Sequence, residues 1–214
     1  MRKPAFNTVA ALAIICIIGV ILFWVILLIA QSLNPGYNPI VQSLSDLALG
    51  PYGWLQTIAF FLLAFVAISL GFGFYCGMHK KRGLRTVAVL FVAMAFGEII
   101  TGIFKVDWVK TPLSIHALVH QVGASITAIA FPVAAFMLLP SLRSDPRWKR
   151  LVNYTFVVAV SMLTLEITRE VLLLTTWLNP WFGLYEKALL VNSLVWIEVM
   201  AIHLLRVTNT RKQN

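Results

Sequence analysis

Charged residues are scarce in this sequence. Only 12% of the 214 residues are Asp, Glu, Lys or Arg, whereas about 25% is usual in a soluble domain. Hydrophobic residues make up 60%, and the mean hydropathy is +0.87. This composition excludes an ordinary water-soluble domain and predicts an integral membrane protein.

Cysteines and acidic residues are also few. The two cysteines, Cys16 and Cys76, lie inside apolar runs without a CxxC spacing, so we interpret them as small core residues rather than a disulfide framework. Eight acidic residues stand against 17 basic ones, for a formal net charge of +9. Such a charge can attract nucleic acid. Because the composition provides no water-soluble basic face, we expect no nucleic-acid partner.

The sequence does contain six long apolar stretches, and a helix needs about 20 apolar residues to cross the hydrocarbon core of a membrane. They lie at approximately 8–31, 54–78, 85–104, 114–139, 151–176 and 185–206. Thr111 followed by Pro112 is typical of a helix start before the fourth stretch, with Ser114 as the alternative cap. The expected fold class is all-α: residues 1–214 form a single transmembrane domain, a six-helix bundle.

The distribution of lysine and arginine predicts how this bundle is oriented. Most of these residues lie in four regions: the two ends of the chain, the segment 80–85 and the segment 143–150. All four regions fall on the same side of the six predicted spans. Cytoplasmic connections carry the excess of positive charge in membrane proteins, so both termini are expected to be cytoplasmic.

Polar residues of the spans share one depth. Ionisable groups inside the membrane are costly and often mark functional sites. At a rise of about 1.5 Å per residue, the following residues fall in the extracytoplasmic half or on the connections of that side: Ser45, Asp46, Glu98, Asp107, His116, His120, Glu166, Arg169 and Glu170. They predict an outer-half polar site that binds a ligand. The alternative is an interhelical polar network that only stabilises the bundle.

His116 and His120 lie four residues apart and therefore on one helical face. An HxxxH spacing can supply two ligands to a metal, although HALVH lacks the glutamate of HExxH. A third ligand would come from Asp46, Glu98, Asp107 or Glu170. A divalent metal is one hypothesis for the pair, and hydrogen bonding to carboxylates or to the neighbours of Arg169 is the other.

Four segments resemble a bacterial and archaeal membrane family, the domain of unknown function family 998. They are QSLSDLALGPYGWLQ, GIFKVDW, TPLSIHALVHQVGASITAIAF and SDPRWKR. The resemblance covers nearly the whole chain. It implies a six-helix bundle in a prokaryotic plasma membrane with both ends cytoplasmic, and it implies no reaction. More distantly, Ser45-Asp46 and the pattern of His120, Gly123 and Phe131 look like FRAG/DRAM/Sfk-type proteins, which favours lipid-related roles by analogy.

Three functions are compatible with these features. The favoured one is a non-enzymatic protein that binds a membrane lipid or small amphiphile in an outer-half pocket, with Arg169 contacting anionic groups. The second is an intramembrane metal-dependent hydrolase in which His116 and His120 bind the metal, Asp46 or Glu98 serves as third ligand or base, and Ser45 stabilises an oxyanion. The third is a small transporter subunit, for which Pro132 is the strongest candidate for a broken helix.

Overall fold

Six long helices make up the described part of the protein. The computed structural model describes residues 6–78, 83–107, 112–173 and 180–210. Its elements are α1 (Phe6–Ser32), η1 (Ser45–Leu49), α2 (Gly53–Gly77), α3 (Leu84–Ile103), α4 (Ile115–Ser144), η2 (Lys149–Leu151), α5 (Val152–Leu173) and α6 (Phe182–Thr210), and the described residues contain no strand. Among these residues, six helices are long and apolar enough to cross a membrane. The predicted all-α, six-helix membrane fold is confirmed.

Helix α4 contains the fourth predicted span, approximately 114–139, and extends beyond it. It continues to Ser144 with both Pro132 and Pro140 inside it. A proline removes one backbone hydrogen bond and does not by itself end a membrane helix, since neighbouring groups compensate. The predicted end of the fifth helix, at 176, lies outside the described residues.

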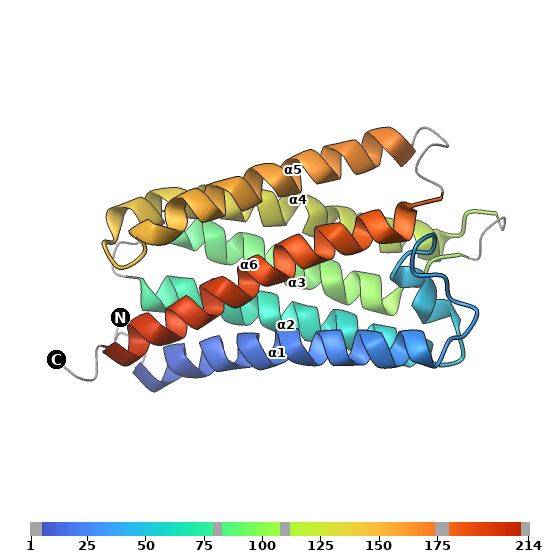
Figure 1. The fold of residues 1–214 in the computed structure, drawn as a ribbon, viewed down its shortest axis with the longest axis horizontal. Coiled ribbons are helices and arrows are strands. Elements are labelled where there is room, and N and C mark those ends of the chain that lie inside the picture. Colours follow the sequence, from blue (N-terminus) through green and yellow to red (C-terminus); the bar gives the residue numbers. More distant parts are fainter. Residues whose placement is uncertain (1–5, 79–82, 108–111, 174–179, 211–214) are drawn as a thin grey trace.

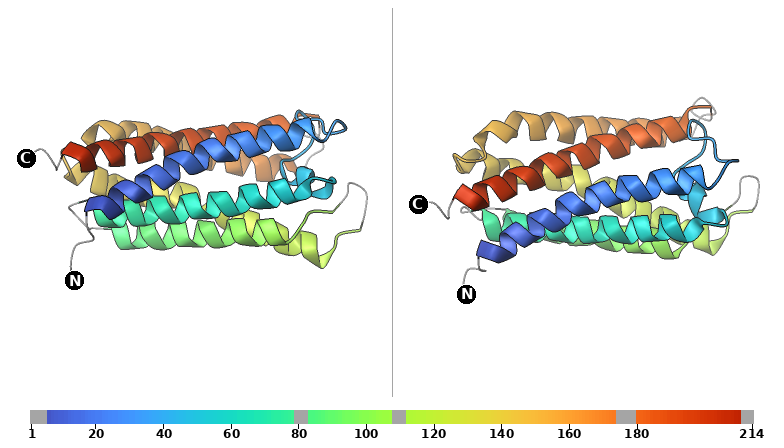
Figure 2. Two further views of the ribbon diagram at one scale, coloured as in Figure 1. Left: turned by 90° about the horizontal axis from the view of Figure 1, so that it is seen from below. Right: turned by 60° about the horizontal axis from the view of Figure 1, so that its bottom comes forward.

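The helices form a closed ring. Each helix packs against the next in sequence order, and α6 returns to pack against α1 (Figures 1 and 2). The start of α1 and the end of α6 lie at the same end of the bundle (Figure 1). We call the half of the bundle that holds these ends the terminal half, and the opposite half the distal half. The assignment of the terminal half to the cytoplasm stays a prediction.

Helix α1 illustrates how a fully apolar sequence divides into two faces. Its buried hydrophobic residues recur every three or four positions: Val9, Ala13, Cys16, Val20, Phe23, Leu27 and Ala30. Other large apolar side chains of the same helix are exposed, including Ile18, Ile21 and Leu28. Lipid tails are as apolar as these side chains, so close packing against neighbouring helices, rather than hydrophobicity, decides which face turns inward.

Aromatic side chains fill the centre of the terminal half. Phe74 lies edge-on to Phe91 at 6.1 Å and to Trp148 at 5.8 Å, measured between ring centroids. Trp196 continues the cluster, at 6.3 Å from Phe74 and 5.4 Å from Phe131. Such edge-on pairs are favoured by the ring quadrupoles. The cluster therefore closes the bundle core between the terminal end and the middle of the helices.

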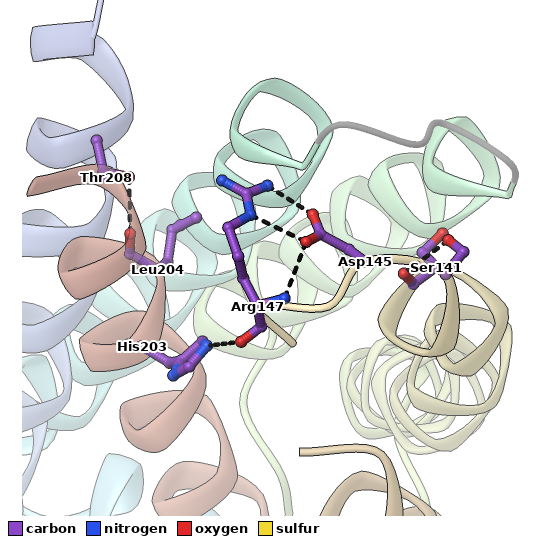
Figure 3. Close-up of polar contacts among 7 residues, drawn as sticks. Ser141, Asp145, Arg147, His203, Leu204 and Thr208 are labelled. Atoms are coloured by element: carbon purple, nitrogen blue, oxygen red, sulfur yellow. Dashed lines mark hydrogen bonds and ion pairs between the residues drawn. The ribbon is translucent and has the colours of Figure 1, made fainter. Parts of the chain in front are cut away.

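The connection between α4 and α5 is fixed by an ion pair. The guanidinium of Arg147 donates two hydrogen bonds to Asp145, at 2.9 and 2.5 Å, and the Arg147 carbonyl oxygen lies 2.9 Å from Nε2 of His203 on α6 (Figure 3). Asp145 is 3% exposed. The DPRW segment at 145–148 is thus a structural joint, in which Trp148 packs against His203 with ring centroids 4.6 Å apart.

The long distal connection, 33–52, is ordered by contacts with the start of α6. Lys187 donates from Nζ to the hydroxyl of Tyr37 at 2.9 Å and to the Pro39 carbonyl at 2.8 Å. Burial raises the pKa of Tyr37, so its hydroxyl stays protonated and donates to the carbonyl of Gln42 at 3.2 Å. The backbone N–H of Leu184 donates to Ile40. These contacts hold η1 over the distal end of the bundle.

Candidate functional site

A cavity of about 180 Å³ lies inside the distal half. All six helices and η1 contribute to its walls. The polar lining consists of Ser45, Gln56, Glu98, Thr101, Thr127, Glu166, Arg169, Glu186 and Ser193, and the rest is apolar, with Phe23, Phe60, Phe131, Met94 and Met162 among the larger side chains. On the terminal side the cavity meets Phe131, which packs against Trp196. An apolar chamber with a few convergent polar groups is typical of small-ligand sites.

Small residues at the crossing of α3 and α4 position much of this lining. A Cβ atom on Gly97 would lie 2.6 Å from the carbonyl oxygen of Gly123 and 2.6 Å from Oγ1 of Thr127. A Cβ atom on Gly123 would lie 2.8 Å from the carbonyl oxygen of Gly97 and from Oγ1 of Thr101. Both helices thus carry glycine followed by threonine four residues later, and the glycines let the two backbones approach closely.

Three carboxyl groups and one guanidinium line the cavity. Glu166 accepts a hydrogen bond from Nε of Arg169 at 3.1 Å. Oε2 of Glu186 accepts from the backbone N–H of Leu44 at 2.6 Å, which ties α6 to η1. Glu98 lies within hydrogen-bonding reach of the Thr127 hydroxyl. Within the described part of the chain, no ion pair joins Glu98 or Glu186 to a cation.

Gln56 is the polar residue of the lining that lacks partners. Its side chain is 0% exposed, and neither Oε1 nor Nε2 has a hydrogen-bond partner among the described residues. Buried amides are normally paired, and a buried polar group without a partner costs about 1–3 kcal/mol. The amide of Gln56 therefore presents a donor and an acceptor to the cavity.

His120 connects the cavity wall to the end of α3. It is 4% exposed. Its Nδ1 lies 2.7 Å from the carbonyl oxygen of Phe104 and 3.1 Å from that of Thr101, and its Nε2 lies 3.0 Å from Oγ of Ser45. The carbonyl oxygens accept only, so Nδ1 carries the proton, and in the neutral ring Nε2 accepts from the Ser45 hydroxyl.

His116 has different surroundings from His120, although they lie on one helix. His116 is exposed, and its ring lies 5.5 Å from that of Phe104. Asp107 accepts hydrogen bonds from the backbone N–H and the hydroxyl of Ser114, each at 2.7 Å, and the Ser114 hydroxyl in turn caps α4 by accepting from Ala117. The alternative cap, Ser114, is therefore the one that begins α4, whereas Thr111 lies outside the described residues.

Asp46 also serves local structure. Its Oδ2 accepts from the backbone N–H of Ser43 at 2.8 Å, and its own N–H donates to Oγ of Ser43 at 3.1 Å. Such a reciprocal pair orders the turn at the start of η1. Glu170 belongs to α5, but its side chain lies outside the described part of the structure.

The predicted site residues therefore separate into two groups. Ser45, Glu98, Glu166 and Arg169 line the cavity, and His120 lies directly behind Ser45. Asp46, Asp107 and His116 are not part of the lining. Sequence reasoning missed Gln56 and Glu186 as lining residues. Glu186 had a signal, since it lies at the distal start of a span, whereas Gln56 had none beyond its position just inside α2. Ligand binding by all of these residues stays a prediction.

The described residues provide no third ligand for a metal ion at the histidine pair. Among them, no group of three or more His, Cys, Asp or Glu side chains gathers in an arrangement that could hold a metal ion. Both ring nitrogens of His120 already face protein oxygens. The metal hypothesis for His116 and His120 stays a prediction without geometric support.

A family profile described as "Protein of unknown function (DUF998)" matches residues 17–203, which includes most of α1 and most of α6. The chain belongs to this family. Every cavity-lining residue lies within the DUF998 region, from Phe23 to Ile197. No curated protein and no solved structure matches the chain. The more distant likeness to FRAG/DRAM/Sfk-type proteins stays a prediction.

Proposed function

We propose that this DUF998 protein binds a membrane lipid or another small amphiphile in the distal cavity. The observation that carries the proposal is Gln56, a fully buried amide without partners that lines an otherwise largely apolar chamber. A molecule with a polar group would satisfy this amide, and its apolar part would contact side chains such as Phe60 and Met94. The cavity lining therefore complements both the polar part and the apolar part of an amphiphile.

The charges of the lining support a ligand with a polar head. Arg169 lines the chamber, and Glu166 holds its side chain by accepting from Nε. A guanidinium in this position is suited to contact an anionic oxygen of the ligand. Glu98 offers a carboxyl group to a donor on the ligand. These groups come from α5 and α3, the helices that flank α4 in the ring, so a head group placed between them would contact both helices.

Binding accounts for this arrangement better than transport does. The aromatic cluster of Phe74, Phe91, Phe131, Trp148 and Trp196 fills the core on the terminal side of the cavity. Helix α4 runs without interruption past Pro132. A transporter of the rocking type uses helices that are broken near the membrane centre, and the candidate for such a break lies within a continuous helix.

Photolabelling with a diazirine-bearing dodecanol tests the proposal. The purified full chain should give cross-links at cavity residues that unlabelled dodecanol competes away. Ala128→Phe, which fills the chamber, should lose the competed labelling. The matched control is Ile129→Phe, because Ile129 is adjacent on α4 but 66% exposed on the outer surface. Labelling confined to outward-facing residues and insensitive to competition would contradict the proposal.

A further inference from the structure

We propose that Ser45 and His120 act as a nucleophile and its general base, transferring the acyl group of a carboxylic ester that is bound in the distal cavity. The inference rests on the proposed function, because the substrate is a bound amphiphile. Its basis is the 3.0 Å separation between His120 Nε2 and Ser45 Oγ. This distance lies within the hydrogen-bonding reach required of a nucleophile and its base.

The imidazole is held in the tautomer that this chemistry needs. The carbonyl oxygens of Phe104 and Thr101 accept from Nδ1–H, which leaves Nε2 as the acceptor that faces Ser45. In serine hydrolases a carboxylate holds the histidine in this way. Here the holders are carbonyl groups at the end of α3, where the helix carries partial negative charge. That charge stabilises the imidazolium that forms when Nε2 takes a proton.

Gln56 supplies the third element, a donor for the developing oxyanion. Its amide and the Ser45 side chain line the same chamber, and its Nε2 has no partner among the described residues. A preorganised amide donor of this kind stabilises the negative oxygen of a tetrahedral intermediate. The unpartnered amide of Gln56 and the Ser45–His120 bond are independent features of the same cavity lining.

The reaction is complete with water as the second substrate. The Ser45 hydroxyl oxygen bonds to the ester carbonyl carbon while its proton moves to Nε2 of His120. The bond from that carbon to the alkoxy oxygen breaks, the alcohol leaves with the proton from Nε2, and the acyl group remains on Ser45. A water molecule then adds to the acyl carbon, giving its proton to Nε2, and the bond to Ser45 breaks as the proton returns to Oγ.

The other hydroxyls of the lining distinguish this arrangement from a simple structural contact. Thr101 donates to the Gly97 carbonyl at 2.8 Å and Ser193 to the Leu190 carbonyl at 2.9 Å, each within its own helix. Thr127 points toward the Met94 carbonyl at 3.4 Å. Ser45 instead faces an imidazole nitrogen from another element. Ser161 on α5 also donates within its own helix, to the Val158 carbonyl at 2.9 Å, and it lies outside the lining, so it is the control serine.

The test is labelling with an alkyl fluorophosphonate, which reacts with activated serines, followed by mapping of the adduct by mass spectrometry. The purified full chain should carry the adduct on Ser45. Ser45→Ala should abolish the adduct, and Ser161→Ala, outside the cavity lining, should retain it. His120→Gln should slow labelling by about a hundredfold, as expected for loss of a general base. Gln56→Met should also slow it by about a hundredfold, as expected for loss of an oxyanion donor.

A second measurement is release of nitrophenolate from p-nitrophenyl dodecanoate, which should require Ser45. Absence of both adduct and turnover in a chain that still shows competed dodecanol labelling would overturn the inference and leave the proposed function intact. Absence of the dodecanol labelling as well would overturn both. Where Ser45→Ala fails to fold by size-exclusion chromatography, the position of the adduct on the unsubstituted chain decides, because an adduct on any other residue contradicts the inference.

Discussion

His120 and Ser45 are hydrogen-bonded at 3.0 Å although 75 positions separate them in the sequence. The bond joins α4 to η1, and the other nitrogen of the same ring reaches the end of α3. One side chain thus connects three elements at the distal end. His116, four residues earlier, is exposed and makes no comparable connection within the described residues.

Replacement of His120 should therefore destabilise the protein far more than replacement of His116. We expect His120→Ala to lower the free energy of unfolding by about 2–3 kcal/mol, because Ser45 and buried carbonyl oxygens lose their partner. His116→Ala should change it by less than about 0.5 kcal/mol, as is usual for exposed positions. Unfolding in increasing sodium dodecyl sulfate, followed by circular dichroism, measures both. Equal effects of the two variants would contradict this account.

Gly97→Ala should also be destabilising, since the added Cβ would lie 2.6 Å from both the Gly123 carbonyl and the Thr127 hydroxyl. Overpacking of a tight contact typically costs about 1–3 kcal/mol. Gly36→Ala is the control, because nothing lies within 4 Å of the position of its Cβ. The same unfolding assay applies. A separation of α3 from α4 should in addition weaken competed dodecanol labelling, since both helices line the cavity.

The fold was predictable because a membrane restricts the solutions. Backbone groups in lipid must be paired within the segment, so apolar stretches of sufficient length become helices. The inward faces were not predictable in the same way. Helix α1 is apolar on all sides, and its buried residues differ from its exposed ones mainly in what they pack against.

The site was predictable only in its depth. The shared depth of Glu98, Glu166 and Arg169 follows from the rise of a helix, and these three do line one cavity. The sequence does not show that Asp107 accepts hydrogen bonds from Ser114, the residue that caps α4. Nor does the spacing of His116 and His120 show that one is exposed and the other buried. Such differences depend on where neighbouring helices cross, and the glycines at 97 and 123 determine that crossing.

Acid should weaken the distal end through Asp107. Hydrogen bonds from the backbone N–H and then the hydroxyl of Ser114 hold the pKa of Asp107 below its ordinary value. Because the folded-state pKa is lowered, the stabilisation is present above the ordinary pKa of about 3.9 and is lost as the pH falls through the folded-state value. The detergent concentration at the midpoint of unfolding should therefore decrease when the pH is lowered below about 4. Asp107→Asn should be less sensitive to this acid range.

Ser114→Ala provides the companion measurement for that acid effect. It removes the hydroxyl donor but keeps the backbone donor, so its acid sensitivity should lie between those of the unsubstituted chain and Asp107→Asn. If all three chains show the same dependence of the unfolding midpoint on pH, Asp107 is not the group responsible.

At the terminal end, Asp145 and Arg147 should be energetically coupled. Asp145 is 3% exposed and pairs with a guanidinium that is only partly exposed. We expect a coupling energy of about 1–2 kcal/mol in a double-mutant cycle of Asp145→Asn and Arg147→Ala, since burial removes part of the solvent screening. Arg143→Ala in place of Arg147→Ala is the control, because Arg143 is exposed in the last turn of α4, just before Asp145. Equal coupling in both cycles would exclude a specific pair.

Accessibility of single cysteines to a membrane-impermeant maleimide tests the expected orientation. Gly36 lies on the exposed distal connection and Lys149 on the exposed terminal connection. If the positively charged side is cytoplasmic, Gly36→Cys should be labelled in intact cells, and Lys149→Cys only after the membrane is permeabilised. The unsubstituted chain is the control for Cys16, which is fully buried, and Cys76, which is half-buried. The reverse pattern would place the termini outside. Water would then reach Ser45 from the cytoplasm, and the amphiphile would belong to the inner leaflet.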